Sequence, residues 1–285
     1  MTWLAIALAA AGACCFALAA WLQQAAVRTA VDTDGLRLSG WLRMLRAPRW
    51  LSGFGLTGLG ASLHAGALGF APLTVIQPVG TVAIALTTVL AVRSAGGRLT
   101  RSTWLAVAAS TLGVGLFVLL VAQRTAMPAP STDGELQAGA VTAVGVALLG
   151  AIGVVAGGRI RCLAYAAAAG MAYGLVSVYV HTIATGHPHP FAVIGLLAAL
   201  PVGMWFVQHA YASGPPQVVI ACQTVVDPML GVGVGLGLLG EAGSLHRSVA
   251  VALALCGCVA VAGVVLLARE HVVGPLSPSR AGGSP

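Results

Sequence analysis

Runs of about twenty apolar residues recur along this chain, and they constrain its fold more than any other feature. Short segments with proline, glycine or arginine separate nine such runs, at residues 3–24, 51–71, 73–92, 103–122, 136–157, 162–185, 190–210, 216–239 and 247–268. A helix of about 20 apolar residues crosses the hydrocarbon of a bilayer. The sequence therefore predicts an all-α polytopic membrane protein with about nine transmembrane helices.

The composition excludes a soluble globular protein. Of the 285 residues, 58% are hydrophobic and 7% are charged, whereas soluble domains carry roughly 25% charged residues. All fourteen basic residues are arginines, and they lie mainly in the short segments between the apolar runs. Because a nucleic-acid surface needs a basic stripe on a soluble face, we predict no nucleic-acid partner and attribute the net charge of +7 to membrane orientation.

The arginines also predict the orientation of the chain. If the N-terminus lies outside, the segments that face inward hold 12 arginines, whereas those that face outward hold only Arg124 and Arg247. Positive segments stay on the cytoplasmic side during insertion. We therefore expect a plasma-membrane protein with its N-terminus outside and its C-terminus in the cytoplasm. Because no basic residue precedes residues 3–24, we interpret this run as a membrane helix and not as a signal peptide.

A weak internal repeat relates two parts of the chain at an offset of about 146 residues. Residues 99–102 return as 245–248, and Gln77 returns as Gln223. One helix lies between the two four-helix units, so they would insert with opposite orientations. Inverted repeats are typical of secondary transporters, whose solute site lies near the bilayer midplane. The alternative is a duplication that is retained for packing alone.

The repeat predicts the organisation of the chain. We expect a first repeat at residues 1–135, a linking helix at 136–157, a second repeat at 158–271 and a disordered cytoplasmic tail at 272–285.

Two short motifs resemble the drug/metabolite transporter superfamily. Residues 60–72 end in Phe-Ala-Pro and are followed by Gln-Pro-Val-Gly at 77–80, which is similar to its nine-helix NIPA-like branch; Leu-Leu-Gly-Glu at 238–241 is similar to EamA-type members. The resemblance implies a carrier of small solutes, and the NIPA-like branch would imply Mg²⁺. The chain departs from that branch at His64, where asparagine is typical, and at 97–99, where Gly-Arg-Leu replaces Glu-Arg-Leu. These departures weigh against Mg²⁺ but not against the superfamily.

Asp227 is the one carboxylate deep within an apolar run. An acid there is costly unless it is paired, protonated or facing water, so it is a functional candidate by default. Gln223 lies one turn earlier on the same helical face, and at the repeat offset this pair corresponds to Gln77 and Thr81. A proline follows one member of each pair and frees a backbone carbonyl. The pairs would face each other at a solute or ion site; the alternatives are a protonated strut at Asp227 and simple proline kinks.

Two further groups complete the candidate site. Tyr173, Ser177 and His181 recur every four residues and would form one polar stripe, which either lines a cavity or packs against a neighbouring helix. His64 and His209 occupy matching positions of the two repeats, at a slightly different offset, and could relay a proton. They form no zinc-binding motif such as HExxH, so we predict no metal site.

The leading functional hypothesis is a secondary transporter of a small organic solute, such as a proton-coupled exporter. A NIPA-like carrier of Mg²⁺ or another cation is the second hypothesis, although Mg²⁺ usually takes one or two carboxylates and only Asp227 is available. A flippase for lipid-linked precursors or an accessory membrane subunit is the third. We predict no enzymatic activity and no cofactor, because neither a GxSxG motif nor a P-loop occurs. The expected partners are a small solute, H⁺ or Mg²⁺, and membrane lipid. The sequence leaves open whether the protein forms a homodimer.

Overall fold

The computed structural model describes residues 2–31, 36, 38–70, 76, 79–122, 132–184, 190–238 and 247–270. All regular structure in these ranges is helical. The helices are α1 (Thr2–Ala30), α2 (Leu38–Arg46), α3 (Pro48–Leu68), α5 (Val82–Ser94), α6 (Arg101–Ala122), α7 (Thr132–Val155), α8 (Gly158–Ala184), α9 (Pro190–Ser213), α10 (Pro216–Leu238) and α11 (Arg247–Glu270).

Within the described residues, six helices are long and apolar enough to cross a membrane: α1, α6, α7, α8, α9 and α11. Helix α5 is also apolar, but it has 13 residues. These helices fit the predicted polytopic membrane protein. The count of nine spans and the division into two repeats stay predictions.

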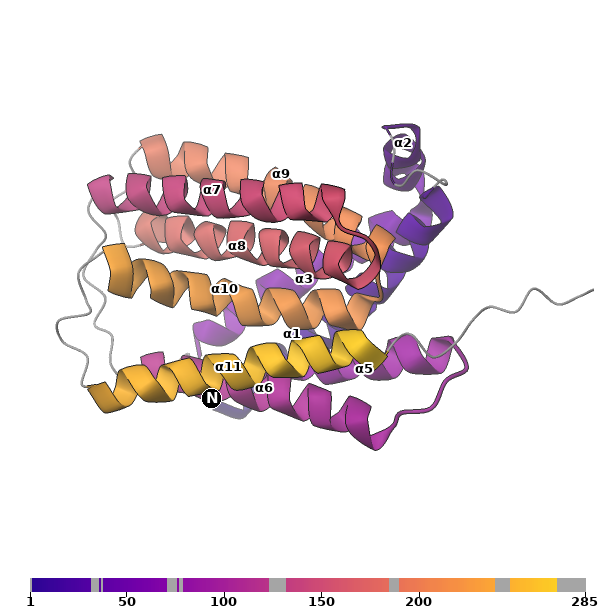
Figure 1. The fold of residues 1–285 in the computed structure, drawn as a ribbon, viewed down its shortest axis with the longest axis horizontal. Coiled ribbons are helices and arrows are strands. Elements are labelled where there is room, and N and C mark those ends of the chain that lie inside the picture. Colours follow the sequence, from indigo (N-terminus) through magenta and orange to yellow (C-terminus); the bar gives the residue numbers. More distant parts are fainter. Residues whose placement is uncertain are drawn as a thin grey trace, which may run out of the picture.

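The helices pack in two layers with α10 between them. Figure 1 shows α7, α8 and α9 in one layer and α5, α6 and α11 in the other. The most extensive contacts join α1 to α3, α8 to α9, α6 to α11 and α8 to α10. Long-range packing in this chain is therefore concentrated in a few helix pairs.

Small residues allow two of these pairs to approach closely. Helix α6 meets α11 where a Cβ added to Gly113 would lie 2.6 Å from the backbone nitrogen of Ala260. Helix α1 meets α3 where a Cβ on Gly12 would lie 3.1 Å from the carbonyl oxygen of Gly60. In lipid there is no hydrophobic driving force between helices, so they associate through close van der Waals packing of this kind.

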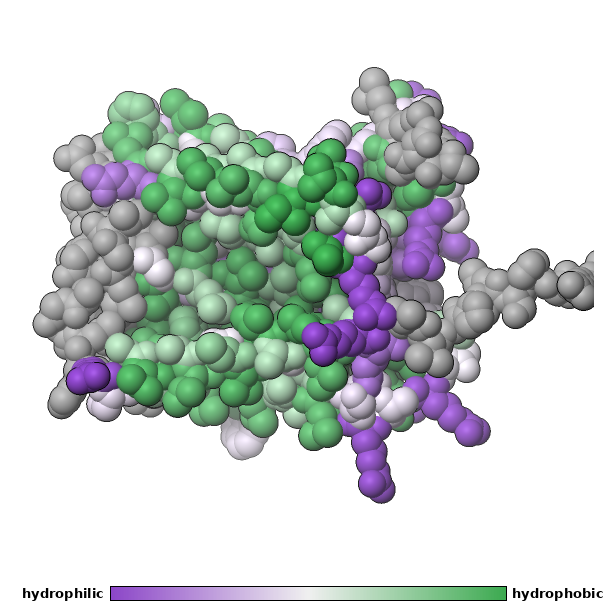
Figure 2. Space-filling view, in the orientation of Figure 1, coloured by the Kyte–Doolittle hydropathy of each residue, from purple (hydrophilic) through white to green (hydrophobic). Residues whose placement is uncertain are grey.

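Arginines gather at one end of the helices. Two hydrogen bonds join elements there: Trp21 Nε1 donates to Ser94 Oγ at 3.0 Å, and Thr103 Oγ1 donates to the Glu270 carboxylate. Figure 2 shows hydrophilic side chains concentrated at this end, beside a wide hydrophobic band. Of the eleven arginines in the described residues, all but Arg247 belong to this end: Arg28, Arg43, Arg46, Arg49, Arg93, Arg98, Arg101, Arg159, Arg161 and Arg269.

One helix lies between the first two predicted apolar runs, 3–24 and 51–71, where no helix is predicted. Helix α1 continues to Ala30, and α2 follows it. The side chains of Trp41 and Met44 are buried, whereas Arg43 and Arg46 are exposed. This spacing makes α2 amphipathic. Because arginines interrupt its apolar residues, the helix does not form an uninterrupted apolar run.

A second difference concerns the run at 73–92. Helix α5 begins at Val82, because Thr81 lies in a turn after the helical residues Val79 and Gly80. Residues 71–75, 77 and 78, which include much of the resemblance motif, lie outside the described part of the chain.

Candidate functional site

Asp227 lies in the middle of α10 and faces α8. Its Oδ1 atom is 3.5 Å from Ser177 Oγ, which is also 3.2 Å from the carbonyl oxygen of Tyr173. Ser177 is exposed and Asp227 is partly buried. The carboxyl therefore lies at the accessible border of the α8–α10 contact and not in the packed core.

Two glycines of α8 bring the helices together at this place. A Cβ on Gly174 would lie 2.9 Å from the carbonyl oxygen of Asp227, and one on Gly170 would lie 3.2 Å from the Cα of Gln223. Larger residues at these positions would push α10 away from α8. The glycines thus set how closely Ser177 approaches the carboxyl.

Gln223 adds a second polar group one turn before Asp227. Its side-chain nitrogen, Nε2, is buried and has no hydrogen-bond partner among the described residues. An unpaired buried donor costs about 1–3 kcal/mol. A solute or a water molecule with a free acceptor would remove this cost, so the α8–α10 contact offers both an acidic group and an unused donor.

The predicted polar stripe on α8 divides between two neighbours. The ring of Tyr173 packs on α9, where a Cβ on Gly203 would lie 2.7 Å from its Cε1 atom. Ser177 faces Asp227 on α10 instead. The side chain of His181 lies outside the described part of the structure. Tyr173 therefore anchors α9, and Ser177 is the stripe residue that belongs to the candidate site.

The two histidines lie towards opposite ends of the helices. His209 is close to the arginine-rich end, because it lies one turn before the end of α9, whereas His64 is near the other end of α3. His64 packs beside Gly80, whose added Cβ would lie 3.2 Å from the His64 Cε1 atom. Within the described residues, neither histidine forms a hydrogen bond or ion pair with Asp227. A proton relay between these groups would therefore need intervening water.

His209 belongs to a cluster of aromatic rings. Its ring centroid lies 4.5 Å from Trp205, 5.6 Å from Tyr165 and 6.0 Å from Trp41. Trp41 of α2 stacks on Trp205 of α9, with ring centroids 4.8 Å apart and planes at 5°. The cluster joins α2 to the end of α9. This arrangement gives His209 a packing role that its sequence position did not indicate.

The first polar pair of the repeat is only partly described. Thr81 is buried at the start of α5, and α5 packs against α10. Gln77 lies outside the described residues. The proposed facing of the two polar pairs therefore stays a prediction.

A buried polar chain that we did not predict joins three helices. Trp50 Nε1 donates to Gln208 Oε1 at 3.3 Å, and Gln208 Nε2 donates to Gln23 Oε1 at 2.8 Å. Gln23 Nε2 then donates to Thr57 Oγ1 at 2.9 Å. Gln208 is 1% exposed and Gln23 is 6% exposed, so the chain replaces hydration for both amides. The sequence signal was two glutamines near the ends of apolar runs, but their pairing spans 185 positions.

The described residues contain no group of three or more His, Cys, Asp or Glu side chains that could hold a metal ion. Among the described residues, the side-chain hydrogen-bonding neighbour of Asp227 is the Ser177 hydroxyl.

The comparisons with known proteins find a relative to which no function is assigned. The chain is 28% identical over 227 residues to an uncharacterized protein of Corynebacterium glutamicum, and the match covers 76% of this chain and 77% of the relative. No family model matches the chain, and no solved structure matches it.

Proposed function

We propose that this protein is a secondary transporter of a small organic solute, coupled to protons, with its solute site between α8 and α10. One observation carries the proposal: a mid-helix carboxyl, Asp227, lies at an accessible helix contact beside Ser177, with the unused Gln223 donor one turn away. Ionisable groups inside apolar bundles are usually functional and face a cavity or partner.

The pairing of the helices supports this reading. Helix α1 packs on both α3 and α5, and α8 packs correspondingly on both α9 and α10. Helices α6 and α11, which the repeat makes equivalent, pack on each other, as do α5 and α10. These matched pairs favour inverted repeats around a central site, whereas the contacts of α1 with α9 and α10 have no counterpart between α8 and α3 or α5 among the described residues.

The chemistry of the site favours an organic solute with both a donor and an acceptor. The Asp227 carboxylate would accept a hydrogen bond or pair with an ammonium group, and Gln223 Nε2 would donate to an acceptor of the same solute. When Asp227 is protonated, it no longer attracts a cation. Proton uptake and solute release would therefore compete at one carboxyl, which couples their movements. In an exporter, this competition occurs on the outer side.

The first experiment identifies the solute. A panel of amines, amino acids and other small polar compounds is screened for thermal stabilisation of the purified protein, because a ligand that binds the folded state stabilises it by mass action. We expect at least one organic compound to stabilise the wild type. Gln223→Leu should weaken that compound's binding by about tenfold, the loss expected for one hydrogen bond of about 1.4 kcal/mol.

The second experiment tests proton coupling in proteoliposomes. We expect Asp227→Asn to retain exchange of the identified solute but to lose accumulation driven by a pH gradient. Glu270→Gln is the matched control, because it also neutralises an acid but lies at the end of α11, where threonines hold it. Full pH-driven transport by Asp227→Asn would sink the coupling proposal. Mg²⁺ flux through the wild type, without movement of any organic compound, would favour the cation carrier instead.

A further inference from the structure

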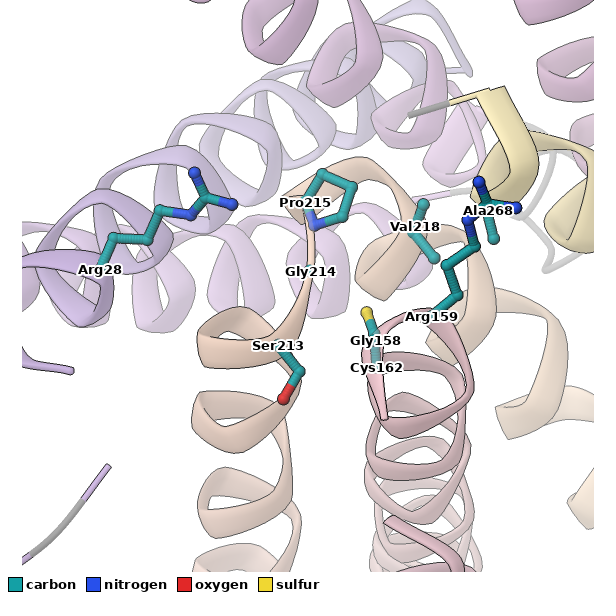
Figure 3. Close-up of a pocket in the computed structure, with 9 residues that line it drawn as sticks. All are labelled: Arg28, Gly158, Arg159, Cys162, Ser213, Gly214, Pro215, Val218 and Ala268. Atoms are coloured by element: carbon teal, nitrogen blue, oxygen red, sulfur yellow. The ribbon is translucent and has the colours of Figure 1, made fainter. Parts of the chain in front are cut away.

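A cavity of about 210 Å³ opens at the arginine-rich end, away from Asp227. Figure 3 shows it among helix ends, with Arg28 and Arg159 on either side of the Gly214–Pro215 turn. The lining residues come from α1, α8, α9, α10 and α11 and the turn between α9 and α10: Arg28, Gly158, Arg159, Cys162, Ser213, Gly214, Pro215, Val218 and Ala268. Val218 precedes Asp227 by nine residues, or roughly 13 Å along a helix.

Among the described residues, the side chains of the two cavity arginines are unpaired, whereas two other arginines of this end are held by backbone carbonyls. Arg161 Nε donates to the carbonyl oxygens of Ala156 and Gly153 at 2.9 and 3.1 Å and so caps the end of α7. Arg43 donates to the carbonyl oxygen of Ala30. Within the described part of the chain, the side chains of Arg28 and Arg159 form neither a hydrogen bond nor an ion pair.

The rest of the lining has no group that would neutralise them. No acidic side chain is among the described residues that line the cavity, and the Ser213 hydroxyl donates to the carbonyl oxygen of His209 at 2.8 Å. Helices α8 and α10 both begin here, at Gly158 and Pro216. Helix N-termini carry partial positive charge and free N–H groups, so their ends add to the positive potential of the two guanidinium groups.

We propose that this cavity, lined by Arg28 and Arg159, binds an oxyanion of the phosphate type. Guanidinium groups match the geometry of phosphate oxygens and bind them with charge-assisted hydrogen bonds. The ligand is either a free phosphate or the phosphoryl headgroup of an anionic lipid, because both present the same oxygens. Arg28 belongs to the first half of the chain and Arg159 to the second, so both halves contribute to the lining of the cavity. The site does not depend on the solute that Asp227 binds.

The test measures stability of the full-length protein against two probes. Inorganic phosphate is titrated against sodium chloride at equal ionic strength in detergent, and phosphatidylglycerol nanodiscs are compared with phosphatidylcholine nanodiscs. We expect saturable stabilisation by one probe or both; a response to phosphatidylglycerol alone identifies a lipid headgroup. Arg28→Gln and Arg159→Gln should each weaken apparent binding by at least about tenfold, since a hydrogen bond to a charged group contributes about 1.5–3 kcal/mol.

Matched variants separate a built site from general attraction to positive charge. Arg98→Gln removes the same charge at the same end but lies outside the cavity, so it should respond as the wild type does. Arg28→Lys should recover part of the response, because it restores charge but not the forked geometry. Both cavity arginines are exposed, so their glutamine variants should fold.

Two outcomes would overturn the proposal. One is a wild type that responds to neither probe beyond the chloride control. The other is an Arg98→Gln variant that loses the response as fully as Arg28→Gln does.

Discussion

The contact between α6 and α11 can be tested with one substitution at two neighbouring glycines. A Cβ on Gly113 would lie 2.6, 2.8 and 2.9 Å from the backbone nitrogen, Cα and Cβ of Ala260. A Cβ on Gly115, two residues later on the same helix, would meet no heavy atom within 4 Å. Gly113→Ala and Gly115→Ala therefore add the same atom to the same helix, once into a neighbouring backbone and once into open space.

The expected difference follows from these distances. Carbon atoms are in favourable contact at about 3.5–4.0 Å, so α11 would have to move by roughly 1 Å to accommodate the methyl group that Gly113→Ala adds. Overpacking of this kind costs about 1–3 kcal/mol. Both variants gain helix propensity of up to about 1 kcal/mol, and this gain cancels in the comparison. We expect Gly115→Ala to be neutral or stabilised and Gly113→Ala to be less stable than it by about 1–3 kcal/mol.

The assay is unfolding in mixed micelles by titration with sodium dodecyl sulfate, followed by tryptophan fluorescence. Gly263→Ala provides an independent check from the other helix, because its Cβ would lie 2.8 Å from the carbonyl oxygen of Ala106. If Gly113→Ala and Gly115→Ala unfold with free energies within about 0.5 kcal/mol of each other, the close approach of α6 and α11 is refuted, since surface substitutions vary by that much.

The remaining predictions concern the buried polar chain and the orientation. Gln208→Leu leaves Trp50 Nε1 and Gln23 Oε1 without their partner, so the free energy of unfolding should fall by about 1–3 kcal/mol in the same assay. Gln24→Leu, at a residue whose side chain forms no hydrogen bond to the described residues, should change the free energy of unfolding by less than about 0.5 kcal/mol, and equal effects of the two substitutions would contradict the assignment. In a variant whose six native cysteines are replaced by alanine, single cysteines in place of Arg98 and Arg247 should label from opposite sides with a membrane-impermeant maleimide, Arg247→Cys from outside and Arg98→Cys only after permeabilisation. Labelling of both from one side would reject the proposed orientation.

The long helices could be predicted because membrane helices satisfy all backbone hydrogen bonds locally. Apolar runs such as 103–122 and 190–210 therefore correspond to α6 and α9 without knowledge of any neighbour. Helix α2 does not appear as an apolar run, because it is apolar on one face only. Its signal was the spacing of Trp41 and Met44 between arginines, which predicts an amphipathic helix at a membrane surface.

The candidate site was only partly accessible to sequence reasoning. The place of Asp227 in an apolar run predicts that it lies deep in a helix. Helical periodicity predicts that Gln223 lies on the same face. The proximity of Ser177 to Asp227 depends on Gly170 and Gly174, which set the distance between two helices. Side-chain direction also decides the role of Tyr173, whose ring packs on α9.

The hydrogen bond from Thr103 to Glu270 has a consequence for synthesis of the protein. Its partners are 167 positions apart, and ribosomes add about 5–20 residues per second. Helix α6 is therefore made roughly ten to thirty seconds before α11, the helix that covers its Gly113 face. During this interval a nascent chain presents that face to other membrane helices, and a chaperone or insertase that shields it would protect the chain from mispairing.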